Sequence, residues 1–116
     1  MTNREKYKQA IGNRVTVTVD RPIGSVHPEH ADLVYSVNYG FVDGVVGGDG
    51  EWQDAYILGV NEPVSTFSGV VIAVIVRKDD VETKWVVAPE GVTFTEKQIA
   101  ADVNFQERYF DVTILT

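Results

Sequence analysis

The sequence predicts a mainly β fold, a small closed or nearly closed barrel of five to six strands with one late α-helix. Several short runs of β-branched and apolar residues are separated by glycine and proline, as in small β-domains. The only well-marked helix start comes late in the chain. Closure is expected because an open sheet of this size would leave its edge strands exposed. At 116 residues the chain has the length of one domain, so residues 1–116 are predicted to fold as one unit.

The first elements are a short helix and a strand. Residues Lys6 to Ile11 can form a helix that ends at Gly12, because glycine adopts the left-handed conformation common after helices. Val15 to Val19 alternates valine with threonine. This pattern predicts a strand with its valines facing the core and its threonines facing outward.

The next segment leaves the sheet and then returns to it. Arg21 to Pro28 holds two prolines and a glycine, which predicts an ordered loop. Leu33 to Val42 is predicted to be the second strand, broken or bulged near Gly40.

Two glycine turns are followed by three further strands. Asp43-Gly44 and Gly47-Gly48 are turn signals. The third strand is expected over Ala55 to Gly59. Val70 to Val76 is apolar without alternation, which predicts a strand buried on both faces, and Lys84 to Ala88 makes a fifth.

The late helix has a recognisable start. Thr95-Glu96-Lys97-Gln98 fits a capping box, and Phe94 and Ile99 have the spacing of a hydrophobic staple. The helix is therefore expected from Glu96 to about Asn104. Tyr109 to Leu115 can return as a last strand.

Composition limits the classes of function. Lys and Arg number 10 against 17 Asp and Glu, and a net charge of −7 disfavours nucleic acid as a partner. No cysteine is present, so disulfides and thiolate chemistry are excluded. The first residues lack a signal-peptide core, and the longest apolar run is too short to span a membrane. A cytoplasmic domain without membrane contact is expected.

Two acidic groups are the main candidates for chemistry. Asp49 and Glu51 would point the same way in extended backbone, and Asp54 can join them if the chain turns. Such oxygen ligands suit Mg²⁺ or Mn²⁺. A solvated acidic turn is the alternative. The second group, Asp79-Asp80-Val81-Glu82 before Lys84, is by itself typical of a charged hairpin tip, but its order after the first group favours a place in the same cleft.

The order of these motifs resembles the soluble family I inorganic pyrophosphatases. Four segments carry the resemblance: Tyr35 to Phe41, Asp49 to Asp54, Asp79 to Pro89 and Phe105 to Tyr109. Four motifs in the right order are more specific than any one of them.

The resemblance implies an OB-like barrel that hydrolyses inorganic diphosphate with Mg²⁺. It implies metal ligands at Asp49, Asp54, Asp79 or Asp80, and Glu82. It assigns Glu51 to the attacking water and Tyr39, Lys84 and Tyr109 to the phosphate oxygens. Homo-oligomers are also implied, since relatives in this family assemble.

The chain departs from the family pattern at several positions. Glu51 and Trp52 stand where the family has aspartate and proline, and Phe110 stands at a lysine position. The candidates to replace the missing cations are Arg21, His27, Arg77, Lys78 and Arg108, and the sequence does not distinguish among them. Two alternatives therefore stay open: a hydrolase or binder of another small phosphorylated ligand, and a non-catalytic barrel that binds a protein.

Overall fold

The computed structural model describes residues 3–78 and 82–116 and has six strands in its main sheet. The elements in chain order are α1 (Asn3–Lys8), β1 (Arg14–Arg21), β2 (Val26–His27), β3 (His30–Val34), β4 (Asn38–Val46), β5 (Trp52–Ile57), β6 (Thr66–Arg77), β7 (Thr83–Ala88), α2 (Glu96–Glu107) and β8 (Val112–Leu115).

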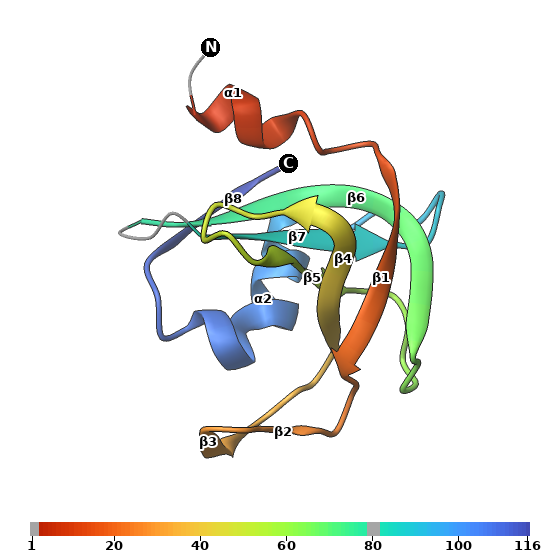
Figure 1. Ribbon diagram of the computed structural model, residues 1–116, viewed down its shortest axis with the longest axis vertical. Helices are drawn as coiled ribbons and strands as arrows, with labels where there is room; N and C mark the ends of the chain where they lie inside the picture. The colour runs from red at the N-terminus through yellow and green to blue at the C-terminus, as the bar shows by residue number, and fades with distance from the viewer. Residues whose placement is uncertain (1–2, 79–81) are drawn as a thin grey trace.

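Five of these strands close into a barrel in the order β1-β4-β5-β7-β6, and β6 pairs again with β1 (Figure 1). β5 and β7 run parallel, whereas the other pairs are antiparallel. β8 pairs with the last part of β6 outside the ring. The predicted small closed barrel with a late helix is therefore confirmed.

A separate hairpin interrupts the barrel between β1 and β4. β2 and β3 pair with each other and form a two-stranded sheet at one end of the molecule (Figure 1). The segment Arg21 to Pro28 leaves the barrel as predicted, but its Val26 and His27 form a strand rather than a loop. The predicted strand Leu33 to Val42 is two strands, because the chain turns from the hairpin into the barrel at residues 35–37.

Gly40 allows β1 and β4 to approach closely. A Cβ at Gly40 would lie 1.9 Å from the carbonyl oxygen of Thr18. The irregularity expected near this glycine lies across from it, where the register shifts between Val19 and Arg21. The bulge therefore belongs to β1 and not to β4 itself.

Other predicted boundaries shift by a few residues. The first helix ends at Lys8, and the chain reaches Gly12, with a φ of 97°, through further turns. Asp43-Gly44 lies within β4 and is not a turn; Gly44 has a φ of 87° where the register with β5 shifts. The last strand begins at Val112, since the residues directly after α2 form a turn.

The predicted start of α2 is confirmed. The Thr95 side chain accepts from the backbone N–H of Gln98, and the Gln98 side chain accepts from that of Thr95. The helix continues to Glu107, one turn beyond the predicted end. Within the described ranges, neither helix is long and apolar enough to cross a membrane.

The core has two parts, one on each face of the barrel wall. Val17, Val42, Ile57, Val71 and Val87 come from all five barrel strands and form the inner cluster. The outer cluster lies between the wall and α2, and its buried residues are Leu33, Tyr35, Tyr39, Tyr56, Leu58, Ala73, Ile75, Val86, Ile99 and Val103. The outer cluster contains three tyrosines, so the α2 side of the barrel carries polar groups.

Candidate functional site

Strand alternation places three charged side chains on the outer face of the barrel wall. Asp54 precedes Tyr56 by two residues on β5, and Lys84 precedes Val86 by two on β7. Arg77 follows Ile75 by two at the end of β6. Since residues two apart in a strand share a face, all three charges lie on the side that α2 covers.

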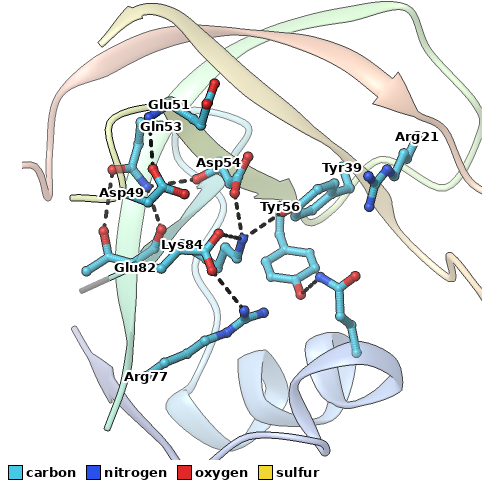
Figure 2. A network of polar contacts seen from close by, with 12 residues as sticks. Arg21, Tyr39, Asp49, Glu51, Gln53, Asp54, Tyr56, Arg77, Glu82 and Lys84 are labelled. Carbon is cyan, nitrogen blue, oxygen red and sulfur yellow. Dashed lines mark hydrogen bonds and ion pairs between the residues drawn. The ribbon is translucent and has the colours of Figure 1, made fainter. Parts of the chain in front are cut away.

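Lys84 is the centre of the site. Its Nζ donates to Asp54 Oδ2 at 2.6 Å, to Glu82 Oε1 at 2.6 Å and to the Tyr39 hydroxyl at 2.9 Å (Figure 2). The lysine side chain is only 4% exposed, so its charge is compensated by these carboxylates rather than by bulk water.

These groups lie on one wall of a cleft of about 450 Å³. The cleft is bounded by the barrel wall, the β2–β3 hairpin and the end of α2. Its lining residues are Asp20, Arg21, His27, His30, Asp32, Leu33, Tyr39, Asp54, Arg77, Glu82, Lys84, Gln106, Tyr109 and Phe110. Arg21, Arg77 and Lys84 bring positive charge into a cleft of an otherwise acidic protein.

Three of the predicted ligand carboxylates come together. One oxygen each from Asp49, Asp54 and Glu82 lies within 4.8 Å of the others, a set that could hold a metal ion. Asp54 and Glu82 are partly buried, whereas Asp49 is exposed in the turn between β4 and β5. The predicted ligands Asp79 and Asp80 lie outside the residues that the structure describes.

Glu51 lies apart from this set. Gly50 has a φ of 86°, and Asp49 Oδ1 accepts from the backbone N–H of Glu51 at 3.0 Å, so the chain turns sharply here. The side chains of Asp49 and Glu51 were expected to point the same way, which requires extended backbone. The backbone turns at Gly50 instead, so the two side chains diverge. The exposed Glu51 carboxylate points away from Lys84 (Figure 2).

Arg77 connects the barrel to the end of α2. Its Nε and Nη2 donate to the two oxygens of Glu107 at 3.0 and 2.8 Å, and its Nη1 donates to Glu82 Oε2 at 3.1 Å. Glu107 also accepts from the Tyr56 hydroxyl at 2.5 Å. The Arg77 side chain is 8% exposed and that of Glu107 3%, which makes this a buried ion pair.

The network continues from α2 to the hairpin side of the cleft. Gln106 donates to the Tyr56 hydroxyl at 2.6 Å and accepts from the Tyr35 hydroxyl at 2.7 Å. Arg21 in turn donates to Tyr35 at 2.5 Å, and its guanidinium lies 5.7 Å from the centre of the Tyr39 ring. Among the described residues, no buried side-chain polar atom lacks a partner.

The surroundings shift the pKa values of several of these groups. Burial, followed by the charge of Asp54, raises the pKa of Tyr39 well above its ordinary value. Burial and the charge of Glu107 do the same for Tyr56. Burial by itself lowers the pKa of Arg77, but the hydrogen bonds to Glu107 and the charge of that carboxylate have the larger combined effect, so the pKa of Arg77 is raised overall. Both tyrosines are therefore neutral hydrogen-bonding groups at physiological pH, and Arg77 is a permanent cation.

The remaining predicted residues lie at the mouth of the cleft. Tyr109 lines it but is 56% exposed, and its hydroxyl accepts from Arg108 Nη2 at 2.9 Å. Arg108 is exposed and does not itself line the cleft. Arg21 lies inside the cleft, held over Tyr35 and Tyr39.

Glu107 was missed from the sequence, although a signal for it exists. Ile99, Val103 and Glu107 are four residues apart and therefore follow one face of α2. The first two residues are buried apolar side chains, so a carboxylate at the third position indicates a buried cation opposite.

Neither a protein-family model nor a curated protein sequence matches this chain. Solved structures of bacterial inorganic pyrophosphatases do share its fold. The pyrophosphatase of Ehrlichia chaffeensis aligns with a TM-score of 0.65 and 18% identity, over 88% of this chain and 84% of that one. Those of Coxiella burnetii and Helicobacter pylori give TM-scores of 0.65 and 0.61 at 17% and 18% identity, covering 88% of this chain and 83% and 82% of theirs. The resemblance seen in the sequence is thus confirmed at the level of the fold.

Proposed function

We propose that this chain hydrolyses inorganic diphosphate to two phosphates, with Mg²⁺ as its cofactor. The observation that carries the proposal is the meeting of Asp49, Asp54 and Glu82 beside Lys84 in one cleft. The pyrophosphatase fold supports the same reaction class.

The carboxylates are suited to one hard divalent ion. Mg²⁺ is usually held by one or two carboxylates, with water and substrate phosphate oxygens completing its shell, and this set of three supplies enough oxygens for that. Lys84 lies 2.6 Å from two of these carboxylates and competes for the same oxygens, so the ion would share Asp54 and Glu82 with the lysine. Each carboxylate has about four acceptor positions, which makes sharing possible.

The chain's own residues would bind and orient the diphosphate. Bound Mg²⁺ would supply a Lewis acid that neutralises phosphate charge and makes water more acidic. The Lys84 ammonium and the neutral Tyr39 hydroxyl would hold phosphate oxygens at the cleft floor, with Tyr109 and Arg21 at its sides. Glu51 remains the proposed base, which requires the turn from Asp49 to Glu51 to change direction when substrate binds.

Phosphate release from diphosphate, measured while Mg²⁺ or Mn²⁺ is titrated, tests this proposal. We expect activity to need the metal and to fall by two or more orders of magnitude in Asp54→Asn and Glu51→Gln. Asp43→Asn is the matched control, since Asp43 is exposed on β4 and outside the cleft lining. Full activity in both Asp54→Asn and Glu51→Gln would refute the assignment. Loss in Asp54→Asn alone would remove only Glu51 from the mechanism.

A second candidate is a hydrolase or binder of a larger phosphorylated molecule. The cleft of about 450 Å³ has the size that holds drug-sized ligands. Its hairpin end also carries Asp20 and Asp32, which are acceptors for hydroxyl groups. Competition between diphosphate and a panel of nucleotides and sugar phosphates separates the two candidates, and a preference for diphosphate over all of them excludes the second. The association of identical chains and a cytoplasmic location stay predictions.

A further inference from the structure

Arg77 enters the cleft as a buried cation that the acidic motifs do not account for. It is the last residue of β6, and the alternation from Ala73 through Ile75 turns its side chain to the cleft side. Figure 2 shows the guanidinium reaching from below toward Glu82 and Lys84.

The guanidinium is held rigidly on two sides. Its Nε and Nη2 form a fork to the two oxygens of Glu107, at 3.0 and 2.8 Å. The Phe110 ring lies against its face, with the ring centre 3.6 Å from the guanidinium carbon. Such a bidentate interaction fixes the plane of the guanidinium, so the N–H groups on its other edge point in a fixed direction.

That remaining edge, formed by Nη1 and Nη2, is the part that lies toward Glu82 and the cleft. A guanidinium has five N–H groups, and the described residues accept from three of those on Arg77. Glu82 accepts from one of the two N–H groups on this edge, and no described residue accepts from the other, which is left for an acceptor in the cleft. Arginine in this geometry suits phosphate oxygens better than lysine does.

Glu82 lies between two fixed positive charges. Its Oε1 accepts from Lys84 at 2.6 Å and its Oε2 from Arg77 at 3.1 Å. Each oxygen is therefore already neutralised by the protein. The described residues contain one three-carboxylate group, and both its partly buried members contact Lys84.

We propose that Arg77 is a built-in cation of the cleft that binds a phosphate oxygen and positions Glu82. This rests on the proposed phosphate function of the site. Arg77 then supplies positive charge that would otherwise come from a second metal ion. One consequence follows: diphosphate binds measurably without metal. The competing reading is a purely structural brace between β6 and α2.

Calorimetric titration of inorganic diphosphate in EDTA tests the proposal without using turnover. Removing Arg77 alone would strand the buried Glu107, so the informative variant is Arg77→Met combined with Glu107→Gln, compared with Glu107→Gln alone. We expect the metal-free affinity of the double variant to be at least about tenfold below that of Glu107→Gln, the loss of one charge-assisted hydrogen bond. Lys78→Met is the control for net charge, because Lys78 is exposed and pairs with Asp111.

Each outcome decides the proposal. Equal affinities in the double variant and in Glu107→Gln, or no metal-free binding by the unaltered protein, would leave Arg77 a brace only. If the double variant does not fold by circular dichroism, Arg77→Lys takes its place: it keeps the charge but loses the fork, and unchanged affinity would contradict the proposal. Arg77-dependent binding with no phosphate release would uphold it while refuting the hydrolase function.

Discussion

Replacing Lys84 by methionine should destabilise the protein and strengthen its response to Mg²⁺. The ammonium is 4% exposed and bonds to two carboxylates at 2.6 Å, while the side chains of Asp54 and Glu82 are 27% and 20% exposed. Removing one partner of a buried ion pair costs about 3–5 kcal/mol. Because water reaches both carboxylates in part, we expect about 2–4 kcal/mol for Lys84→Met.

The measurement is the free energy of unfolding from urea titration, in EDTA and again with Mg²⁺. Without the lysine, a cation between Asp54 and Glu82 no longer competes with an ammonium for Asp54 Oδ2 and Glu82 Oε1. Mg²⁺ should therefore stabilise Lys84→Met more than it stabilises the unaltered protein. For the variant, the gain in the free energy of unfolding should be about 2.7 kcal/mol when Mg²⁺ is at a hundred times its dissociation constant.

Lys78→Met is the matched control for this measurement. The Lys78 and Asp111 side chains are 70% and 74% exposed and 3.7 Å apart, so their loss should cost less than about 1 kcal/mol. A Lys84→Met variant as stable in EDTA as Lys78→Met would refute the reasoning, as would an equal Mg²⁺ response in Lys84→Met and the unaltered chain.

Three further perturbations have defined outcomes. Gly40→Ala should cost about 3 kcal/mol or more in urea unfolding, because its Cβ would meet backbone at 1.9 Å, whereas Gly44→Ala, with no atom within 4 Å, should cost only about 1–2 kcal/mol for its positive φ; equal costs would contradict this. Tyr56→Phe should lose about 1–3 kcal/mol in the same assay, since the buried Gln106 Nε2 loses its acceptor and Glu107 Oε2 keeps only Arg77 as a donor. The pKa of His27, measured by NMR titration, should lie below 6.5, because burial and then the positive charge of Arg21 disfavour the protonated imidazole. It should rise in Arg21→Met. Since folding depresses this pKa, the stability that neutral His27 contributes is present above pH 6.5 and is lost as the pH falls through its folded value; a value above 6.5 would reverse the sign.

Local sequence patterns were enough to predict most of the barrel. Val15 to Val19 lies within β1, with Val17 fully buried, because alternation reflects burial directly. The capping box at Thr95 specified the start of α2 for the same reason: its hydrogen bonds are made within four residues. The break at residues 35–37 was not predictable, because it follows from where the hairpin must rejoin the barrel and not from a local breaker.

The candidate site was predicted in part. The order of the motifs suggested that Asp54, Glu82 and Lys84 would meet, and the structure places them in contact. The direction of Glu51 depends on the turn at Gly50, which spacing alone does not define. The pairing of Arg77 with Glu107 joins residues thirty positions apart, and a barrel must close before such a contact can be recognised.

The seam between β1 and β6 determines when the cleft can exist during folding. Thr16 and Ser68 face each other there with hydroxyls 2.8 Å apart, although 52 positions separate them in the chain. Closing so long a loop is entropically costly and slow, whereas the local pairing of β4 with β5 needs only a short turn. A folding chain can therefore hold native-like hairpins before it has a binding site. Because the cleft takes residues from β1, β4, β5, β6 and β7, we expect it to be complete only once the barrel has closed, and partly folded chains to bind its ligand weakly.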